Sequence, residues 1–142
     1  MFVIFEGLDK SGKTTLEWEF LKATNFKYVV VDRGPAGYMV FDRLFERRTL
    51  KSDASFILDA KRMMEHDMAI IVYCKVSEDI AMKRLDEHGE TCPYDYKFAQ
   101  QLYDMNIRML YDENKVVTID TSSSIGECVE RIVEKLQEVL KR

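Results

Sequence analysis

One stretch decides the fold of this chain: Phe2-Val3-Ile4-Phe5-Glu6-Gly7-Leu8-Asp9-Lys10-Ser11-Gly12-Lys13-Thr14-Thr15. It contains the phosphate-loop (P-loop) pattern G-x-x-x-x-G-K-[ST], running from Gly7 to Thr14. An apolar, strand-like run precedes the pattern, and a helix-like run from Thr15 to Leu21 follows it. This strand–loop–helix order is the context in which the pattern binds phosphate.

The residue types of the loop suit a nucleotide triphosphate. Glycines let backbone N–H groups converge on a phosphate, the Lys13 ammonium can reach the outer phosphates, and the Thr14 hydroxyl can ligate Mg²⁺. The predicted phosphate-binding residues are Gly7, Asp9, Lys10, Ser11, Gly12, Lys13, Thr14 and Thr15. Two alternatives stay open: a Gly-rich corner that matches by chance, and a loop that binds nucleotide without turnover.

The composition is typical of a soluble globular protein. The 142 residues are 46% hydrophobic and 32% charged, which predicts one soluble globular domain covering residues 1–142. A net charge of −4 argues against broad, non-specific nucleic-acid binding. Three widely spaced cysteines, with no C-x-x-C pair, suggest reduced thiols and a cytoplasmic location. The sequence shows neither a signal peptide nor a membrane span.

Strand and helix patterns alternate along the chain. Strand patterns occur at Phe2–Glu6, Tyr28–Asp32, Met68–Cys74 and Lys115–Asp120. Helix patterns occur at Thr14–Ala23, Ala36–Arg47, Asp53–Glu65, Ser77 or Glu78 to Glu87, Tyr94–Tyr111 and Ser124–Leu140. We therefore expect an α/β P-loop NTPase sandwich of three layers, with about four parallel strands in the order 2-1-3-4 and helices on both faces. Ligands of such sheets bind beyond the carboxyl ends of the strands.

Asp32 and Arg33 stand at the carboxyl end of the second predicted strand. Phosphoryl transfer depends on positioning and charge neutralisation, so a carboxylate for Mg²⁺ and an arginine for phosphate suit this place. Asp32 could hold the metal through water, or take a proton from an acceptor hydroxyl. The alternative is an Asp–Arg turn that is capped locally.

The residues Phe5 to Thr15 resemble the phosphate loop of thymidylate kinases, and Val30-Val31-Asp32-Arg33 resembles the Asp-Arg motif of that family. Ile70 to Leu85 is similar to the strand and helix that lead into the family's lid, and Val116 to Asp120 is similar to its last strand. The resemblance implies an ATP- and Mg²⁺-dependent kinase that phosphorylates a nucleotide or nucleoside. The acceptor it favours is a deoxynucleoside monophosphate.

The resemblance also implies roles for single residues. Asp9 would contact the acceptor sugar, Lys10 would face the transferring phosphate, Arg33 the acceptor phosphate, and Arg84 the donor base. The implied catalytic residues are Lys13, Asp32, Arg33 and Lys10. A solvated lysine at position 10 and a salt-bridged helix arginine at position 84 are the alternatives. The family's members are usually dimers, so a homodimer is possible.

The chain departs from the family in two segments. Thr24-Asn25 leads almost directly into the strand that ends at Asp32, where the family has a further strand and helical region with an acceptor-phosphate arginine. The lid stretch Asp86 to Pro93 holds three acids and no arginine. Arg43 and Arg47, one turn apart on a predicted helix, could replace the lost arginine or meet a nucleic-acid backbone; a solvated face is the alternative.

Two aromatic groups complete the predictions. Tyr38, after Gly34-Pro35-Ala36-Gly37, could stack on an acceptor base, although core packing is equally compatible. Tyr103 and Tyr111 of the long helix are interpreted as core or rim residues. Besides the nucleotide or nucleoside kinase, two functions stay open: a kinase for a hydroxyl of DNA, RNA or a modified base, and a nucleotide-binding regulatory protein without turnover.

Overall fold

Four short strands, each rich in β-branched residues, form one parallel sheet at the centre of the computed structural model, which describes residues 1–141. The strands are β1 (Phe2–Glu6), β2 (Val29–Asp32), β3 (Ala69–Lys75) and β4 (Val116–Asp120). Their spatial order is β2-β1-β3-β4, and every pair is parallel. The predicted order 2-1-3-4 is confirmed.

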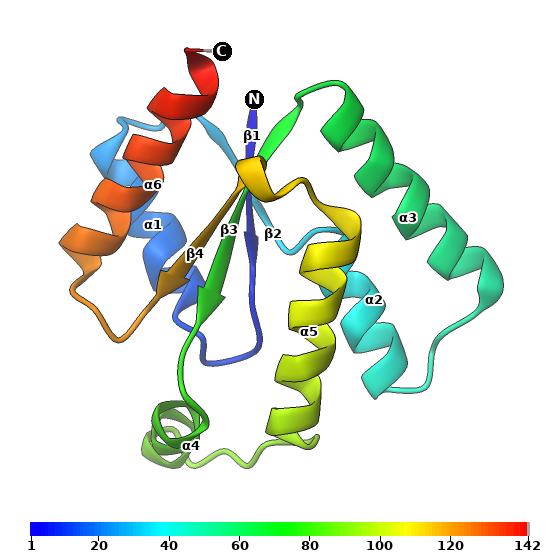
Figure 1. Ribbon diagram of the computed structural model, residues 1–142. Helices are drawn as coiled ribbons and strands as arrows, with labels where there is room; N and C mark the ends of the chain where they lie inside the picture. The colour runs from blue at the N-terminus through cyan, green and yellow to red at the C-terminus, as the bar shows by residue number, and fades with distance from the viewer. Residues whose placement is uncertain (142) are drawn as a thin grey trace.

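Helices cover both faces of the sheet (Figure 1). On one side lie α1 (Lys13–Ala23) and α6 (Ile125–Leu140). On the other lie α2 (Pro35–Leu44), α3 (Leu50–Glu65) and α5 (Tyr96–Leu110), with α2 packed against both α3 and α5. The short α4 (Glu78–Glu87) lies at the end of the sheet toward which the strand arrows point, and the 3₁₀ turn η1 (Glu113–Lys115) leads into β4.

The alternation of side chains along the strands divides the core into two layers. Ile4 faces α2, α3 and α5, whereas Val3 and Phe5 face α1 and α6. β3 is buried along nearly its whole length because strands lie on both sides and helices cover both faces. Because all four strands are parallel, they end at the same edge of the sheet, and the loops that follow them lie there.

Local hydrogen bonds shift several helix boundaries from their predicted positions. α5 begins at Tyr96 and not at Tyr94, because the Asp95 side chain caps it by accepting from the Phe98 amide at 3.1 Å. The predicted helix Ala36–Arg47 is too long: α2 ends at Leu44, and Glu46 adopts a left-handed φ of 55°. Arg47 therefore lies beyond the helix, and it does not share a helical face with Arg43.

The connection from α1 to β2, residues 24–28, is short and contains two consecutive left-handed residues. Asn25 has a φ of 52° and Phe26 a φ of 58°, a conformation that is costly for a residue as bulky as phenylalanine. The turn delivers the chain straight into β2, which forms one edge of the sheet. Within residues 1–141, no helix is both long and apolar enough to pass through a lipid bilayer.

Candidate active site

A cleft of about 1010 Å³ opens at the carboxyl edge of the sheet. Its walls come from three segments: the loop and first turn of α1 (residues 8–16), the end of α4 with the following loop, and the residues after β4. Its volume matches the upper range of small-molecule sites. The cleft therefore lies at the edge of the sheet where the sequence predicts ligand binding.

The loop between β1 and α1 is held open by unusual backbone angles. Gly7 has a φ of 151°, Lys10 of 62° and Gly12 of 85°. A Cβ on Gly7 would lie 2.6 Å from the carbonyl oxygen of Cys74, so only glycine fits there. In residues 1–141, no side chain caps the start of α1, so its first N–H groups are left for an anion. The buried Ser11 hydroxyl likewise lacks a partner.

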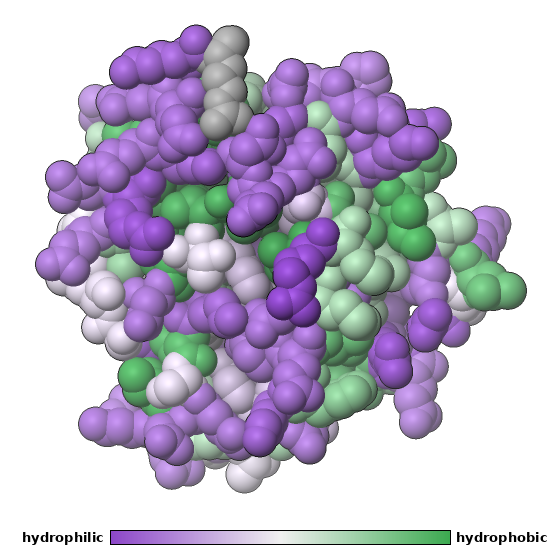
Figure 2. Space-filling view, in the orientation of Figure 1, coloured by the Kyte–Doolittle hydropathy of each residue, from purple (hydrophilic) through white to green (hydrophobic). Residues whose placement is uncertain are grey.

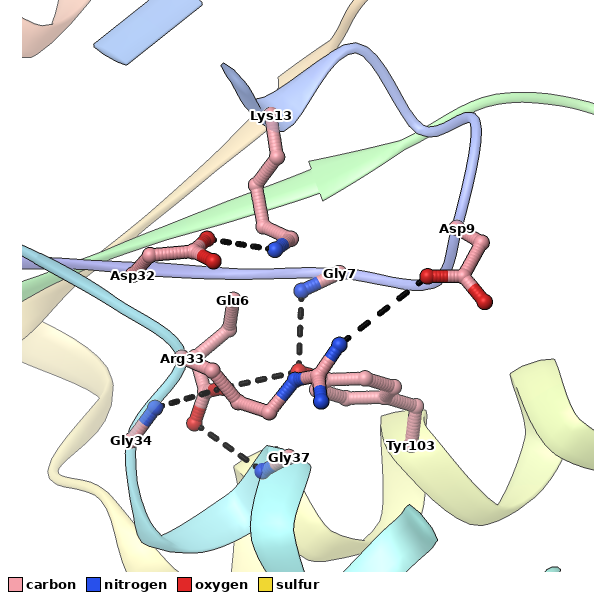
Figure 3. Close-up of polar contacts among 9 residues, drawn as sticks. All are labelled: Glu6, Gly7, Asp9, Lys13, Asp32, Arg33, Gly34, Gly37 and Tyr103. Carbon is pink, nitrogen blue, oxygen red and sulfur yellow. Dashed lines mark hydrogen bonds and ion pairs between the residues drawn. The ribbon is translucent and has the colours of Figure 1, made fainter.

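Lys13, at the start of α1, points toward Asp32, at the end of β2 (Figure 3). The Lys13 ammonium lies 2.6 Å from Oδ1 of Asp32, and only 10% of the Lys13 side chain is exposed. The two residues predicted for phosphate and metal are therefore in contact. A third group, the Glu17 carboxyl one turn along α1, hydrogen-bonds to Asp32, and its buried Oε1 has no partner.

The two carboxyl groups differ in protonation. Burial, together with the hydrogen bond to Asp32 and the negative charge of Asp32, raises the pKa of Glu17 to about 8. Burial acts in the same direction on Asp32, but hydrogen bonds from Glu17 and Lys13 and the charges of Lys13 and Arg33 outweigh it and lower the pKa of Asp32. Near neutral pH the pair therefore carries one proton, on Glu17. Sequence reasoning missed Glu17, whose only signal was its place four residues after Lys13.

Arg33 points from the loop after β2 toward the phosphate loop, as Figure 3 shows. Its guanidinium lies 3.9 Å from Oδ1 of Asp9 and 3.9 Å from the centre of the Phe41 ring. The backbone of Arg33 is left-handed, with a φ of 70°, and its buried Nε makes no hydrogen bond. Asp9 and Arg33, both predicted on the acceptor side, are thus brought together, with part of the arginine's donor capacity unused.

Lys10 and Arg84 tie the phosphate loop to the opposite wall. The Lys10 ammonium pairs with Glu90 of the loop after α4 at 3.1 Å. Arg84 donates to the Lys10 carbonyl at 2.8 Å and to the Thr121 carbonyl at 3.3 Å, and the Thr121 hydroxyl donates to the Ser11 carbonyl at 2.5 Å. Arg84 therefore braces the loop and lines the cleft. No local sequence pattern indicates Glu90 or Thr121 as partners.

Arg43, Arg47 and Tyr38, the other residues predicted to bind the acceptor, lie outside the cleft. Arg43 contacts the Phe98 ring of α5, at 5.8 Å from its centre. Arg47 lies 3.8 Å from Asp42 and close to the Phe45 ring. Tyr38 stacks on Phe56 of α3, with 5.6 Å between ring centres. None of the three lines the cleft, whose walls lie within residues 8–128.

The donor set suits Mg²⁺ that enters with a nucleotide. Thr14 is exposed at the start of α1 and supplies a hydroxyl, and Asp32 supplies a carboxylate. Oxygen ligands of this kind, one or two carboxylates together with substrate phosphates, are what Mg²⁺ prefers in phosphate-transfer sites. Across residues 1–141, three or more metal-binding His, Cys, Asp or Glu side chains do not come together.

A buried carboxylate lies at the end of β1. Glu6, the last residue of β1, is completely buried, and its carboxylate accepts four hydrogen bonds. The donors are the Gly34 amide after β2, the Gly37 amide in the first turn of α2, and the hydroxyls of Tyr103 in α5 and Tyr111 at its end. The only sequence signal was an acid that closes an apolar strand. Tyr103 and Tyr111, predicted as core or rim residues, are buried and supply two of these bonds.

Comparison with known proteins was made by sequence and by structure. No family model matches the chain. The chain is 30% identical over 140 residues to a thymidylate kinase from Ehrlichia canis (strain Jake), in a match that covers 89% of this chain and 69% of that protein.

Two solved structures share the fold. YorR from Bacillus subtilis, in complex with phosphorylated GDP, superposes with a TM-score of 0.75 at 16% identity, covering 100% of this chain and 99% of that one. Deoxyadenosine kinase from M. mycoides with bound dCTP gives a TM-score of 0.59 at 15% identity, covering 97% and 100%. Because both sequence identities are low, these two similarities support a shared fold and nothing further.

Proposed function

Because the chain belongs to the thymidylate kinase family of P-loop nucleotide kinases, we propose that it transfers the γ-phosphoryl group of ATP to a nucleotide or nucleoside, with Mg²⁺ bound alongside ATP. A deoxynucleoside monophosphate is the preferred acceptor. The observation that carries the proposal is the 2.6 Å contact between Lys13 and Asp32, because it joins the phosphate-loop cation to a carboxylate at the tip of the neighbouring strand.

On the donor side, the backbone amides of residues 7–15 receive the phosphates of ATP. As the phosphates enter, Lys13 exchanges its contact with Asp32 for the outer phosphate oxygens. The Thr14 hydroxyl and the Asp32 carboxylate would hold Mg²⁺. When bound, Mg²⁺ neutralises part of the charge on the β- and γ-phosphates. Arg84, at the cleft wall, lies beside the donor nucleoside.

On the acceptor side, Asp9 binds the sugar and Arg33 the acceptor phosphate. An acceptor oxygen forms a bond to the γ-phosphorus while the bond from that phosphorus to the β,γ-bridging oxygen breaks, and ADP leaves with the electron pair. Lys10 neutralises charge that develops on the moving group once its pairing with Glu90 is released. A phosphate acceptor needs no base, whereas a hydroxyl acceptor would pass its proton to Asp32.

We also propose that the enzyme acts in the cytoplasm, with residues 1–142 forming one kinase domain, and that it forms a homodimer. Figure 2 shows apolar residues gathered over the region of α3 and α5. The exposed apolar side chains on these two helices are Leu50, Ile57, Leu58, Phe98, Met105 and Met109. A surface of this kind supports self-association. Sedimentation at two protein concentrations tests it, and a monomer at both would contradict it.

The test of the activity is a product screen. The protein is incubated with Mg²⁺·ATP and, separately, nucleosides, nucleoside monophosphates and hydroxyl-bearing oligonucleotides, and phosphorylated products are identified by mass spectrometry. We expect a deoxynucleoside diphosphate. Lys13→Ala should abolish the product, whereas Lys22→Ala, which removes an exposed lysine paired with Glu19, should leave it unchanged.

Other outcomes point to the other candidates. Phosphorylated oligonucleotides would replace the proposal with a nucleic-acid kinase. Binding of ATP by the wild type without product from any acceptor would replace it with a regulatory nucleotide-binding protein. Absence of ATP binding would contradict every version of the proposal.

A further inference from the structure

The carboxylate of Glu6 is fully buried and has no cationic partner among its hydrogen bonds. Its Oε1 accepts from the Gly34 amide at 3.1 Å and from the Tyr103 hydroxyl at 2.7 Å. Its Oε2 accepts from the Gly37 amide at 3.2 Å and from the Tyr111 hydroxyl at 2.7 Å. A buried charge of this kind is tolerated because four donors surround it.

Two glycines allow the backbone to approach this carboxylate closely. A Cβ at position 37 would lie 2.6 Å from Oε1 of Glu6 and 2.5 Å from the Tyr103 hydroxyl oxygen. A Cβ at position 34 would lie 2.8 Å from a methyl carbon of Ile4 and 3.0 Å from the Tyr111 hydroxyl oxygen. The segment from Arg33 to the first turn of α2 is therefore held against the end of β1 at two points, Gly34 and Gly37.

The Tyr103 hydroxyl carries the connection to the phosphate loop (Figure 3). It donates to Glu6 and accepts from the amide of Gly7, the first residue of the loop, at 2.9 Å. Its ring is completely buried and stacks on Tyr73 at 5.4 Å, so the hydroxyl has a fixed position. The Tyr111 hydroxyl donates to the other oxygen of Glu6, Oε2, and accepts from the Ala36 amide of α2 at 3.2 Å.

We propose that Glu6 is a positioning residue that sets the phosphate loop and the Asp32–Arg33 loop at a fixed distance, with Tyr103 as the link. The inference rests on the proposed phosphoryl transfer, because it assigns Glu6 the alignment of its donor and acceptor sides. Rates of such reactions are sensitive to displacements of about 1 Å. One buried carboxylate controls both sides because its bonds reach Gly34, next to Arg33, and through Tyr103 reach Gly7.

A purely structural role for Glu6 would make the two tyrosines equivalent. Each donates one hydrogen bond to the same carboxylate at the same distance, and each accepts one backbone amide. Only Tyr103 touches the phosphate loop. Tyr103→Phe and Tyr111→Phe are therefore a matched pair that keep both rings and remove one hydroxyl each, and they avoid the folding risk of changing Glu6 itself.

The first measurement needs no ligand: amide hydrogen exchange of the free protein. Tyr111→Phe should raise exchange in residues 33–37 and leave residues 7–14 as in the wild type. Tyr103→Phe should raise exchange in both segments. Equal exchange of residues 7–14 in the two variants would overturn the inference, whatever the protein's activity proves to be.

The second measurement uses a non-hydrolysable ATP analogue with Mg²⁺, titrated by calorimetry. Tyr103→Phe should lower its affinity about tenfold, the effect of losing a hydrogen bond next to a charged group, and Tyr111→Phe less than about twofold. Similar losses in both variants, in step with equal losses of thermal stability, would reduce Glu6 to a structural residue. A wild type that fails to bind the analogue would contradict the proposed function, while hydrogen exchange still decides the positioning role.

Discussion

The Lys13 ammonium lies 2.6 Å from Asp32 Oδ1, so the phosphate-loop lysine is paired with the carboxylate at the tip of the neighbouring strand before any phosphate arrives. Asp32 thereby holds Lys13 at the mouth of the loop and keeps a mostly buried charge paired. The proposed function gives its two members separate roles: Lys13 would act on ATP, and the Asp32 carboxylate on the metal or the acceptor.

Removal of each partner should therefore give a different kinetic result. Lys13→Ala should lower kcat/KM by at least about 100-fold and abolish ATP binding, because the charge that faces the phosphates is lost. Asp32→Asn should lower kcat by about 100-fold while ATP still binds. Steady-state kinetics and calorimetry measure the two effects. If Asp32→Asn and Lys13→Ala lose ATP affinity equally, the division of roles is wrong.

The Lys10–Glu90 pair should restrain the enzyme. Glu90→Gln frees the Lys10 ammonium for phosphate and should lower the KM for ATP by up to about fivefold, because an ion pair whose acid is half-exposed is worth about 1 kcal/mol or less. The gain should fade at high salt. Glu87→Gln removes the same charge from the end of α4 and serves as the control. An unchanged KM in Glu90→Gln would show that the pair has no influence on binding.

Glu17 should make the free protein less stable as pH rises. Its folded-state pKa of about 8 lies above the ordinary value of 4.5, so the folded chain holds an extra proton between these values and loses stability across that interval. Glu17→Gln removes this dependence. It should be more stable than the wild type at pH 9, by about 1 kcal/mol at most because the group is half-exposed, and no more stable at pH 5. Urea denaturation at both pH values measures the difference, and a constant gap would contradict the assignment.

Gly7 should tolerate no side chain. Gly7→Ala places a Cβ 2.6 Å from the Cys74 carbonyl oxygen at a φ of 151°, and should cost about 3 kcal/mol of the free energy of unfolding. Gly126→Ala, where a Cβ meets no atom within 4 Å, should be neutral or slightly stabilising. Denaturant unfolding of the two variants provides the comparison. A Gly7→Ala protein of wild-type stability would mean that the loop is free to shift.

The sequence predicts those parts of the site that depend on one contiguous stretch or on the end of a strand. Gly7 to Thr14 form a loop whose pattern is local, and Asp32 lies beside it because parallel strands end at one edge. Short apolar, β-branched runs between helix patterns likewise indicate a parallel sheet with helices on both faces.

The rest depends on contacts between distant residues that no local pattern records. Tyr103 reaches Glu6 across 97 positions, and Thr121 reaches Ser11 across 110. The helix pattern Ala36–Arg47 extends as far as Arg47, but α2 ends at Leu44 and Glu46 takes a left-handed angle. The protonation of Glu17 follows from burial beside Asp32, which only tertiary structure reveals.

The turn at Asn25 and Phe26 has a consequence for how such chains vary in length. Both residues stand outside the register that joins β2 to β1, which begins at Val29 and Phe2. Residues added or removed at this turn leave Asp32 opposite Phe5, and with it the alignment of donor and acceptor. Segments can therefore be inserted or removed at Asn25 and Phe26 while Asp32 keeps its position relative to the phosphate loop.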